Sequence, residues 1–320
     1  MDPEWVRVLA SFIGHAPPCQ LSDVLKGCKI LTQASNLPSE ISQSCRDLNE
    51  SLLLPVVLPT ALGGDGSVAV VCTPARGSGD NTYAATRGNG YTFQVDQEKQ
   101  ECTGVSVGLP PGFSKGPPAA EPFRAAVEAE LDKYMHSYFP ARGGIVGSAV
   151  FASDGGLDGQ GFLMRIVLSA RHSRPRACWA GVWMSHWNVT WDPVQDKRLG
   201  EGTAAIDGTM EFGVHCTEDA NMNFRRKRKT HSSLPAASMK DAPSFAREVV
   251  ASMCTAEADF HEATEEQCLT MGSGPLKSLR RLLPLSKERF DWRPIRHSLV
   301  KDMKATAKDF ESATAETVVA

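Results

Sequence analysis

The feature that most constrains the fold is a run of strand-like segments followed by one long amphipathic helix. The segments are separated by turn signals and comprise Gly147–Ala152, Gly161–Ser169, Cys178–Asp192 and Thr209–Cys216. Many strands joined by short turns favour an antiparallel sheet. Asp241-Ala242-Pro243 then opens a helix with Pro in its first turn. Its apolar stripe consists of Phe245, Val249, Met253, Ala256, Phe260 and Ala263. The pattern predicts the α+β class.

The third strand-like segment carries a row of tryptophans. Trp179, Trp183, Trp187 and Trp191 are spaced four residues apart, so they share one face of a strand. Such a row could stack a ligand. Large indoles more often form sheet surface that is buried beneath a helix, with their N–H groups bonded at the edges. We expect the buried arrangement, with the long helix as the cover.

Four regions of different character divide the chain. Residues 1–55 hold three short amphipathic segments, which predict a small helical stalk. Residues 56–120 are rich in Gly and Pro and predict a small β region, with strands near Ser67–Cys72 and Tyr91–Val95, followed by an exposed connector. Residues 121–275 comprise a helix that starts near Phe123, the sheet and the long helix. Residues 276–320 form a basic segment and a tail.

Composition indicates a globular protein of the cytosol. The 320 residues are 42% hydrophobic and 22% charged, which is ordinary for a globular chain. No run reaches the ~18–20 apolar residues that a bilayer span needs. The N-terminus lacks the basic stretch and cleavage site of a signal peptide. Nine scattered cysteines predict free thiols in a reducing compartment. We expect a cytoplasmic location.

Signals for catalysis are weak in this sequence. His261-Glu262 begins a motif like the HExxH zinc site, but Glu265 replaces the second His. Cys254 and His261 share a helical face, yet seven residues of helix span ~10.5 Å, too far for one metal. The sequence contains no P-loop and no GxSxG motif. We predict that the protein is not an enzyme and needs no metal or cofactor.

Positive charge is concentrated near the end of the chain. The segment Leu276–Met303 holds eight Lys and Arg against three acids, within a chain of formal net charge −3. Its apolar residues recur at helical spacing. A helix with one apolar stripe and one basic side fits an acidic partner that also offers an apolar groove. The segment therefore predicts an interaction surface.

A second basic run, Arg225–Lys229, permits two interpretations. Clustered Lys and Arg can form a nuclear address or a nucleic-acid patch. A hairpin or loop that carries solvated charge fits the same residues, and we favour it. We therefore expect no nucleic-acid partner.

Seven stretches, in order along the chain, resemble one known family. They are VRVLASFIGHAPPCQLSDVLKGCKIL (6–31), LPVVLP (54–59), YTFQVD (91–96), FRAAVEAELDKYMHSYFP (123–140), WAGVWMSHW (179–187), VHCTEDANM (214–222) and LKSLRRLLPLSKERFDW (276–292). The family is the alpha subunit of F-actin-capping protein (CapZ alpha). The resemblance implies a three-helix stalk, a small β lobe and a sheet of five antiparallel strands, ten across a dimer. It also implies a long helix over the sheet and a C-terminal amphipathic "tentacle" helix.

The resemblance also implies a function. The chain would be the alpha subunit of a dimer that binds actin filament barbed ends without calcium and blocks subunit exchange, placing it in the cytoskeleton. The implied partner is a capping protein beta subunit in a heterodimer; self-pairing as a homodimer stays open. A non-capping structural subunit of a larger cytoskeletal complex is the alternative.

Site residues follow from the same resemblance. The family's actin-contacting basic positions fall on Lys277, Arg281 and Lys287, the last usually being Arg in the family. The apolar side of the tentacle helix falls on Trp292, Ile295, Leu299 and Met303. Phosphoinositides, which compete with actin in the family, would contact Lys277, Arg280 and Arg281.

Three features depart from the family pattern. Pro294 disfavours a helix that begins far upstream, so we expect the tentacle helix to start at about this residue. The tail at 306–320 extends beyond the usual family end. The run Arg225–Lys229 is not a family feature.

Overall fold

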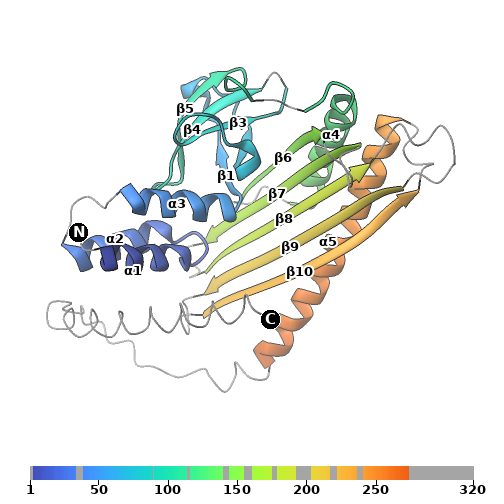
Figure 1. Cartoon of the computed structure of the whole chain (residues 1–320). Coiled ribbons are helices and arrows are strands. Elements are labelled where there is room, and N and C mark those ends of the chain that lie inside the picture. The colour runs from blue at the N-terminus through green and yellow to red at the C-terminus, as the bar shows by residue number, and fades with distance from the viewer. Residues whose placement is uncertain are drawn as a thin grey trace.

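The computed structural model describes residues 3–33, 39–88, 90–113, 116–139, 144–154, 161–174, 179–191, 203–216, 222–235 and 241–273. These residues form helices at the N-terminal end, a small β region, and a broad sheet backed by two further helices (Figure 1). No helix in this described part of the chain is long and apolar enough to cross a bilayer.

The N-terminal end is built from α1 (Pro3–Gly14), α2 (Leu21–Thr32) and α3 (Ser39–Ser51), which confirms the three predicted helices. Their apolar stripes face one another, because burial of those stripes is what stabilises short helices. The buried residues of this core are Leu9, Ile13, Ala16, Leu21, Leu25, Cys28, Ile41, Cys45 and Leu48.

The small β region contains two sheets. Strands β1 (Leu54–Val57) and β2 (Val68–Val71) pair with each other. Strands β3 (Thr82–Ala85), β4 (Tyr91–Asp96) and β5 (Glu101–Val107) form a three-stranded sheet in sequence order. Two short 3-10 helices, η1 (Thr60–Leu62) and η2 (Thr73–Ala75), complete it.

Glu50, at the end of α3, fastens the helices to this region. Its carboxylate is buried and accepts hydrogen bonds from Arg76 Nη2 at 2.8 Å and from the Tyr83 hydroxyl at 2.9 Å. A buried carboxylate is stable only when its oxygens are paired in this way. Burial and the Glu50 carboxylate together raise the pKa of the Tyr83 hydroxyl. The linkage therefore fixes how α3 enters the β region.

The main sheet has five antiparallel strands. They are β6 (Gly144–Asp154), β7 (Phe162–Arg174), β8 (Trp179–Trp191), β9 (Thr203–Cys216) and β10 (Met222–Pro235), in the order β10-β9-β8-β7-β6. The count agrees with the resemblance. The interpretation of Arg225–Lys229 as a hairpin that carries solvated charge is confirmed, because β9 and β10 are consecutive antiparallel strands and all five residues pair within β10 against β9.

Two helices cover one face of this sheet (Figure 1): α4 (Glu121–Tyr138) lies against β6, and α5 (Ala242–Ser273) crosses the strands. Asp241 caps α5, since its Oδ1 accepts a 2.8 Å hydrogen bond from the Ser244 backbone N–H. Phe123 of α4, Trp191 of β8 and Phe245 of α5 form one aromatic cluster with ring centroids 5.2–5.8 Å apart. The cluster joins both helices to the sheet.

The prediction that the tryptophan row is buried beneath a helix is confirmed for three of its four residues. Trp183, Trp187 and Trp191 are buried beneath the helices, whereas Trp179 is half-buried and contacts the His172 ring at 5.0 Å. The expectation that the indole N–H groups bond at the edges was wrong for Trp187, which bonds to α5 in the middle of the sheet. The Nε1 of Trp191 is buried without a hydrogen-bond partner among the described residues.

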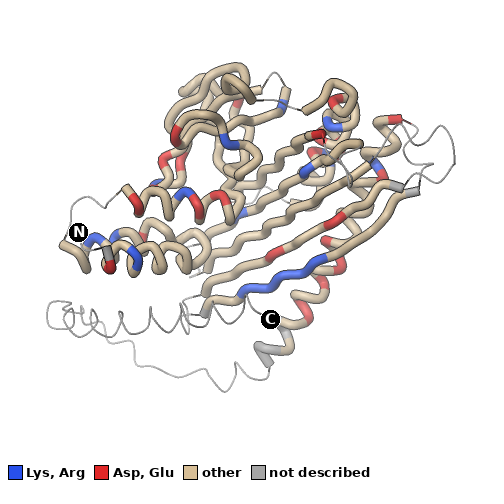
Figure 2. Tube along the Cα trace, viewed as in Figure 1, with Lys and Arg blue, Asp and Glu red and all other residues tan. Residues whose placement is uncertain are grey.

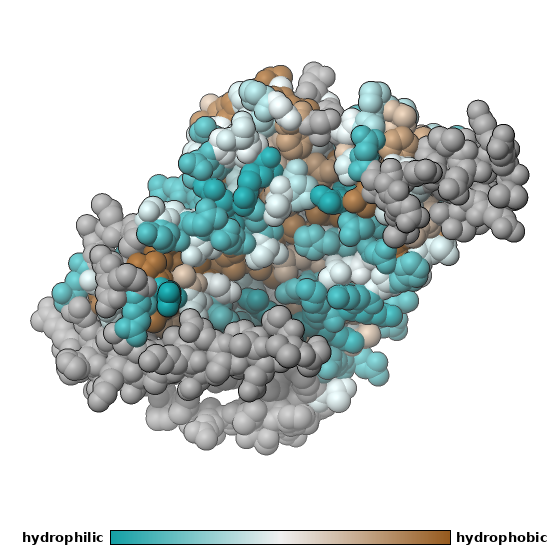
Figure 3. Space-filling model, in the orientation of Figure 1, coloured by the Kyte–Doolittle hydropathy of each residue, from teal (hydrophilic) through white to brown (hydrophobic). Residues whose placement is uncertain are grey.

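The opposite face of the sheet packs against the small β region over β6, β7 and β8. Side chains of both parts form one core, which includes Val56, Val70, Ala149, Phe151, Val167, Val182 and Met184. Over β9 and β10 the side chains of this face are mostly polar. Figure 3 shows hydrophilic residues gathered there.

Candidate partner-binding edge

All of the site residues expected from the sequence lie outside the described residues. They are Lys277, Arg280, Arg281, Lys287, Trp292, Ile295, Leu299 and Met303. The described chain ends at Ser273 of α5. The features of the described residues that bear on function are the two edges of the main sheet and the anchoring of α5.

The edge formed by β6 is covered. The Val150 carbonyl accepts hydrogen bonds from Arg124 Nη1 at 3.3 Å and from Thr86 Oγ1 at 3.4 Å, both outside the sheet. Arg124 is buried and forms ion pairs with Glu121 at 2.7 Å and Glu128 at 3.2 Å. At Val150 the outward carbonyl of β6 is therefore already bonded, which disfavours the addition of another strand there.

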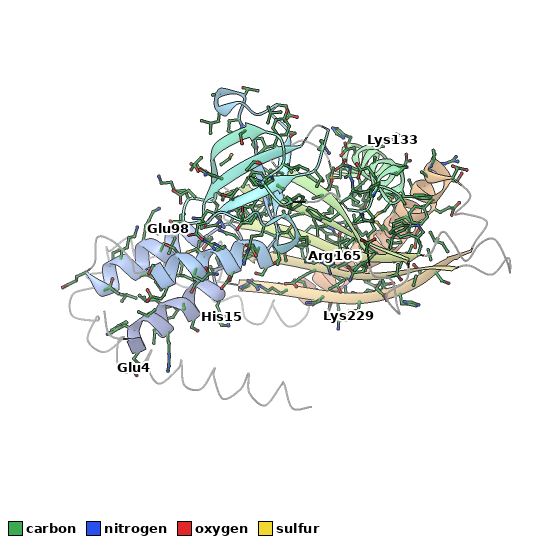
Figure 4. All side chains as sticks on the ribbon, turned by 45° about the horizontal axis from the view of Figure 1, so that its top comes forward. Glu4, His15, Glu98, Lys133, Arg165 and Lys229 are labelled. Carbon is green, nitrogen blue, oxygen red and sulfur yellow. The ribbon has the colours of Figure 1, made fainter. Side chains whose placement is uncertain are left out.

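The edge formed by β10 is open. Among the described strands only β9 pairs with it, along its whole length. Five consecutive cations, Arg225 to Lys229, occupy its middle and appear as a continuous blue stretch in Figure 2. All of them except Arg226 are exposed. Lys229 lies at the outer border of β10 in Figure 4. A long unpaired edge is a template for another strand.

Even-numbered cations of β10 face α5. The Arg226 guanidinium donates a hydrogen bond to Thr264 Oγ1 at 3.1 Å, and its Cζ lies 5.4 Å from the centre of the Phe260 ring. Guanidinium groups stack favourably on aromatic rings at this separation. Further along, Ser232 bonds to Ser252 of α5 at 2.9 Å. Arg226 and Ser232 therefore hold α5 against the edge strand.

Odd-numbered cations of β10 point to the other face. Lys227 lies 3.8 Å from Glu211 of β9, and Arg225 donates a 3.3 Å hydrogen bond to the Ala16 carbonyl at the end of the helical stalk. The neighbouring His186 of β8 has its pKa lowered, by burial and then by the charge of Lys227. This face is thus electropositive at the edge.

The middle of α5 is anchored by a buried carboxylate. Glu257 is fully buried and accepts hydrogen bonds from the Tyr134 hydroxyl at 2.8 Å and from Trp187 Nε1 at 3.2 Å. Burial raises the pKa of Glu257, against the opposing effect of its hydrogen-bond donors. Burial and Glu257 likewise raise the pKa of Tyr134. One side chain thus joins α5, α4 and β8.

The residues that were considered as catalytic candidates pack against other side chains of the fold. His261 of α5 lies beside the rings of Tyr138 and Trp183. Burial raises the pKa of the Cys254 thiol to about 12, which keeps it protonated and a poor nucleophile. Within the described residues, no three side chains of the metal-binding types gather at one point, and the cysteines are free.

Sequence reasoning missed the β10 edge. Phe224 and Leu234 both lie on the helix face of β10. The charged run between them hides the alternation of apolar and polar residues that marks a strand. Whether a strand lies at a free edge of a sheet depends on how the rest of the chain packs around it. A local sequence pattern does not report this.

Comparison with known proteins gives a consistent match. A family model described as F-actin capping protein alpha subunit matches residues 9–302. The chain is 27% identical to the F-actin-capping protein subunit alpha of Dictyostelium discoideum over 297 residues, which is 92% of this chain and 96% of that protein. It is 24% identical to the Caenorhabditis elegans protein of the same name, over 91% of this chain and 94% of the other.

A solved structure shares the fold. It is that of the homodimeric actin capping protein alpha subunit from Plasmodium berghei, with a TM-score of 0.64 and 18% sequence identity, covering 85% of this chain and 94% of the other.

Proposed function

The chain belongs to the F-actin capping protein alpha subunit family, and from this premise we propose that it is one subunit of a dimer that caps actin filament barbed ends. The capping dimer would block both gain and loss of actin subunits. The match over residues 9–302 carries the proposal, because it includes the basic segment as well as the folded body.

We propose that the dimer forms along β10. Edge-to-edge pairing of two such sheets would give ten strands, and it needs one free edge on each subunit. The covered edge of β6 and the open edge of β10 support this choice. The proposed partner is a capping protein beta subunit.

Actin binding is proposed for the segment after α5. Lys277, Arg281 and Lys287 would seat the dimer on acidic actin surface, where complementary charge speeds and orients association. The apolar side of the tentacle would enter a groove on a terminal actin subunit; its residues are Trp292, Ile295, Leu299 and Met303. These contacts are ionic and apolar and need no bridging cation, so capping is expected to be independent of calcium.

Phosphoinositides are proposed as competitors of actin. If this segment is helical, Lys277, Arg280 and Arg281 would fall within one and a half turns and would meet an anionic headgroup together. Each cation near an anionic leaflet contributes roughly 1 kcal/mol. Vesicles containing phosphatidylinositol bisphosphate should release the dimer from filament ends, whereas neutral phosphatidylcholine vesicles should not.

Elongation from filament seeds tests the proposal. The purified dimer is expected to stop growth at low nanomolar concentration, equally in calcium and in a calcium chelator. Unchanged growth with a folded dimer would contradict capping, and arrest only in calcium would contradict calcium independence.

A structural role in a larger cytoskeletal complex is the second candidate. Identity of 27% or less to the curated relatives, Pro294 and the tail at 306–320 favour it. Deleting residues 290–320 separates the two, since a purely structural subunit should keep all its partner binding without them, whereas a capping subunit should lose affinity for filament ends.

A further inference from the structure

The outer edge of β10 carries charge of one sign on both faces of the sheet. Arg226 and Arg228 lie on the α5 face, and Arg225, Lys227 and Lys229 on the other. An edge-pairing partner would place its own side chains directly opposite this run, about 4.5–5.5 Å away between Cβ atoms. The run therefore decides which strands can pair there.

Self-pairing is tightly constrained by symmetry. Two copies joined edge to edge as antiparallel strands are related by a two-fold axis perpendicular to the sheet, so both α5 helices lie on the same face. Even-numbered residues of β10 must then lie opposite even-numbered residues of the second copy. Only a few registers satisfy this condition and also keep most of the strand paired.

Each of the two symmetric registers that pair thirteen of the fourteen residues of β10 sets cation against cation. The register that pairs Met222 with Leu234 places Arg228 opposite its own copy and Lys227 opposite Lys229. The register that pairs Asn223 with Pro235 places Lys229 opposite its own copy. Like charges directly opposite each other on paired strands are destabilising.

Acidic residues that could relieve this repulsion are already engaged on the face away from α5. Glu211 lies 3.8 Å from Lys227, and Asp207 lies 2.8 Å from His231 of the same chain. A second copy would bring the same pairs and five more cations. On that face, relief therefore has to come from a different chain.

We propose that Arg225–Lys229 acts as a specificity device, which prevents this chain from pairing with itself and selects an unlike subunit whose edge strand carries Asp or Glu opposite these positions. This inference rests on the proposed function for the choice of β10 as the dimer edge. It adds that the charge of the run, rather than the shape of the edge, excludes the homodimer.

Self-association of the full chain, measured by sedimentation at low salt, is the test. The neutral variant combines Lys227→Gln, Arg228→Gln and Lys229→Gln, which spares Arg226 and its contact with α5. The control combines Lys26→Gln, Lys99→Gln and Lys133→Gln, removing the same charge from side chains that are 71–74% exposed and far from the edge. A reversed variant combines Lys227→Glu, Arg228→Glu and Lys229→Glu.

Wild type and control are expected to remain monomeric, and the neutral variant to self-associate at least tenfold more tightly. The reversed variant is expected to stay monomeric alone and to form a one-to-one complex when mixed with wild type. Equal self-association of wild type and neutral variant would overturn the proposal, as would failure of the mixed pair to form.

If the chain alone is insoluble, the same variants are co-expressed as two differently tagged copies together with an F-actin capping protein beta subunit. Recovery of the second copy with the first is then expected only for the neutral variant; recovery with wild type would overturn the proposal. These readouts involve no actin, so a failure of capping leaves them unchanged and is distinguished from a failure of the charge device.

Discussion

The indole Nε1 of Trp187 donates a 3.2 Å hydrogen bond to Oε1 of Glu257, which joins the centre of the sheet to the middle of the long helix. Tyr134 of α4 occupies the other carboxylate oxygen at 2.8 Å. In a buried site, removing one member of such a network leaves the others without partners. Glu257 therefore helps to fix the position of α5, which precedes the proposed actin-binding segment in the sequence.

Replacing Glu257 should reveal its raised pKa. Because the pKa in the folded protein lies above the ordinary 4.5, the contribution of Glu257 to stability is complete below pH 4.5 and is lost as pH rises through the folded pKa. Glu257→Gln keeps the side-chain shape without the charge. We expect the melting temperature of the variant to rise relative to wild type between pH 5 and pH 8.

Thermal unfolding of both dimers across that range, followed by tryptophan fluorescence, is the measurement. A constant difference between the two proteins at every pH would show that Glu257 does not titrate in this window. Glu257→Ala, which leaves Tyr134 and Trp187 unbonded, should destabilise at every pH.

Arg226 and Arg228 provide a matched pair on the helix face of β10. Arg226→Gln removes the contact with Phe260 and the bond to Thr264, so it should lower the free energy of unfolding by about 1–2 kcal/mol. The exposed Arg228→Gln should change it by less than about 0.5 kcal/mol. Urea unfolding measures both, and equal losses would mean that Arg226 does not hold α5.

Replacing each of two glycines by alanine should change the stability of the protein in opposite directions. A Cβ on Gly208 of β9 would lie 2.3 Å from Cζ3 of Trp187, so Gly208→Ala should cost about 1–3 kcal/mol of stability. A Cβ on Gly27 of α2 meets nothing within 4 Å, so Gly27→Ala should add about 0.5–1 kcal/mol. A tolerated Gly208→Ala would indicate looser packing of Trp187 than described.

The long helix and the sheet beneath it could be predicted from local pattern. Phe245, Val249, Met253 and Phe260 recur at helical spacing, and all four are fully buried. The tryptophan row was correctly placed under the helix because large indoles at strand spacing are rarely left in water. Patterns of this kind report which side of an element is buried.

The edge strand and the small β region were harder to predict. In β10 five adjacent cations hide the alternation that marks a strand, and β3 is only four residues long. That β3 is a strand depends on its pairing with β4, which is a tertiary property. The actin-contacting residues were identified by resemblance alone, since a basic amphipathic segment fits many acidic partners, and they stay a prediction.

Charge in the segment after α5 should set the affinity for filament ends. Lys277→Ala combined with Arg281→Ala is expected to weaken capping by tens-fold, because the loss of both cations would leave the acidic surface of actin without its partners. Lys26→Ala combined with Lys133→Ala removes the same charge from exposed positions on α2 and α4 and should leave capping unchanged. Equal weakening by the two pairs would point to net charge instead of a defined contact.

Direct observation of single growing filaments tests the central claim. With the dimer at low nanomolar concentration, barbed ends are expected to stop growing and shrinking while pointed ends continue to exchange subunits. Continued growth of barbed ends in the presence of a folded, saturating dimer would contradict the assignment of this chain as a capping subunit.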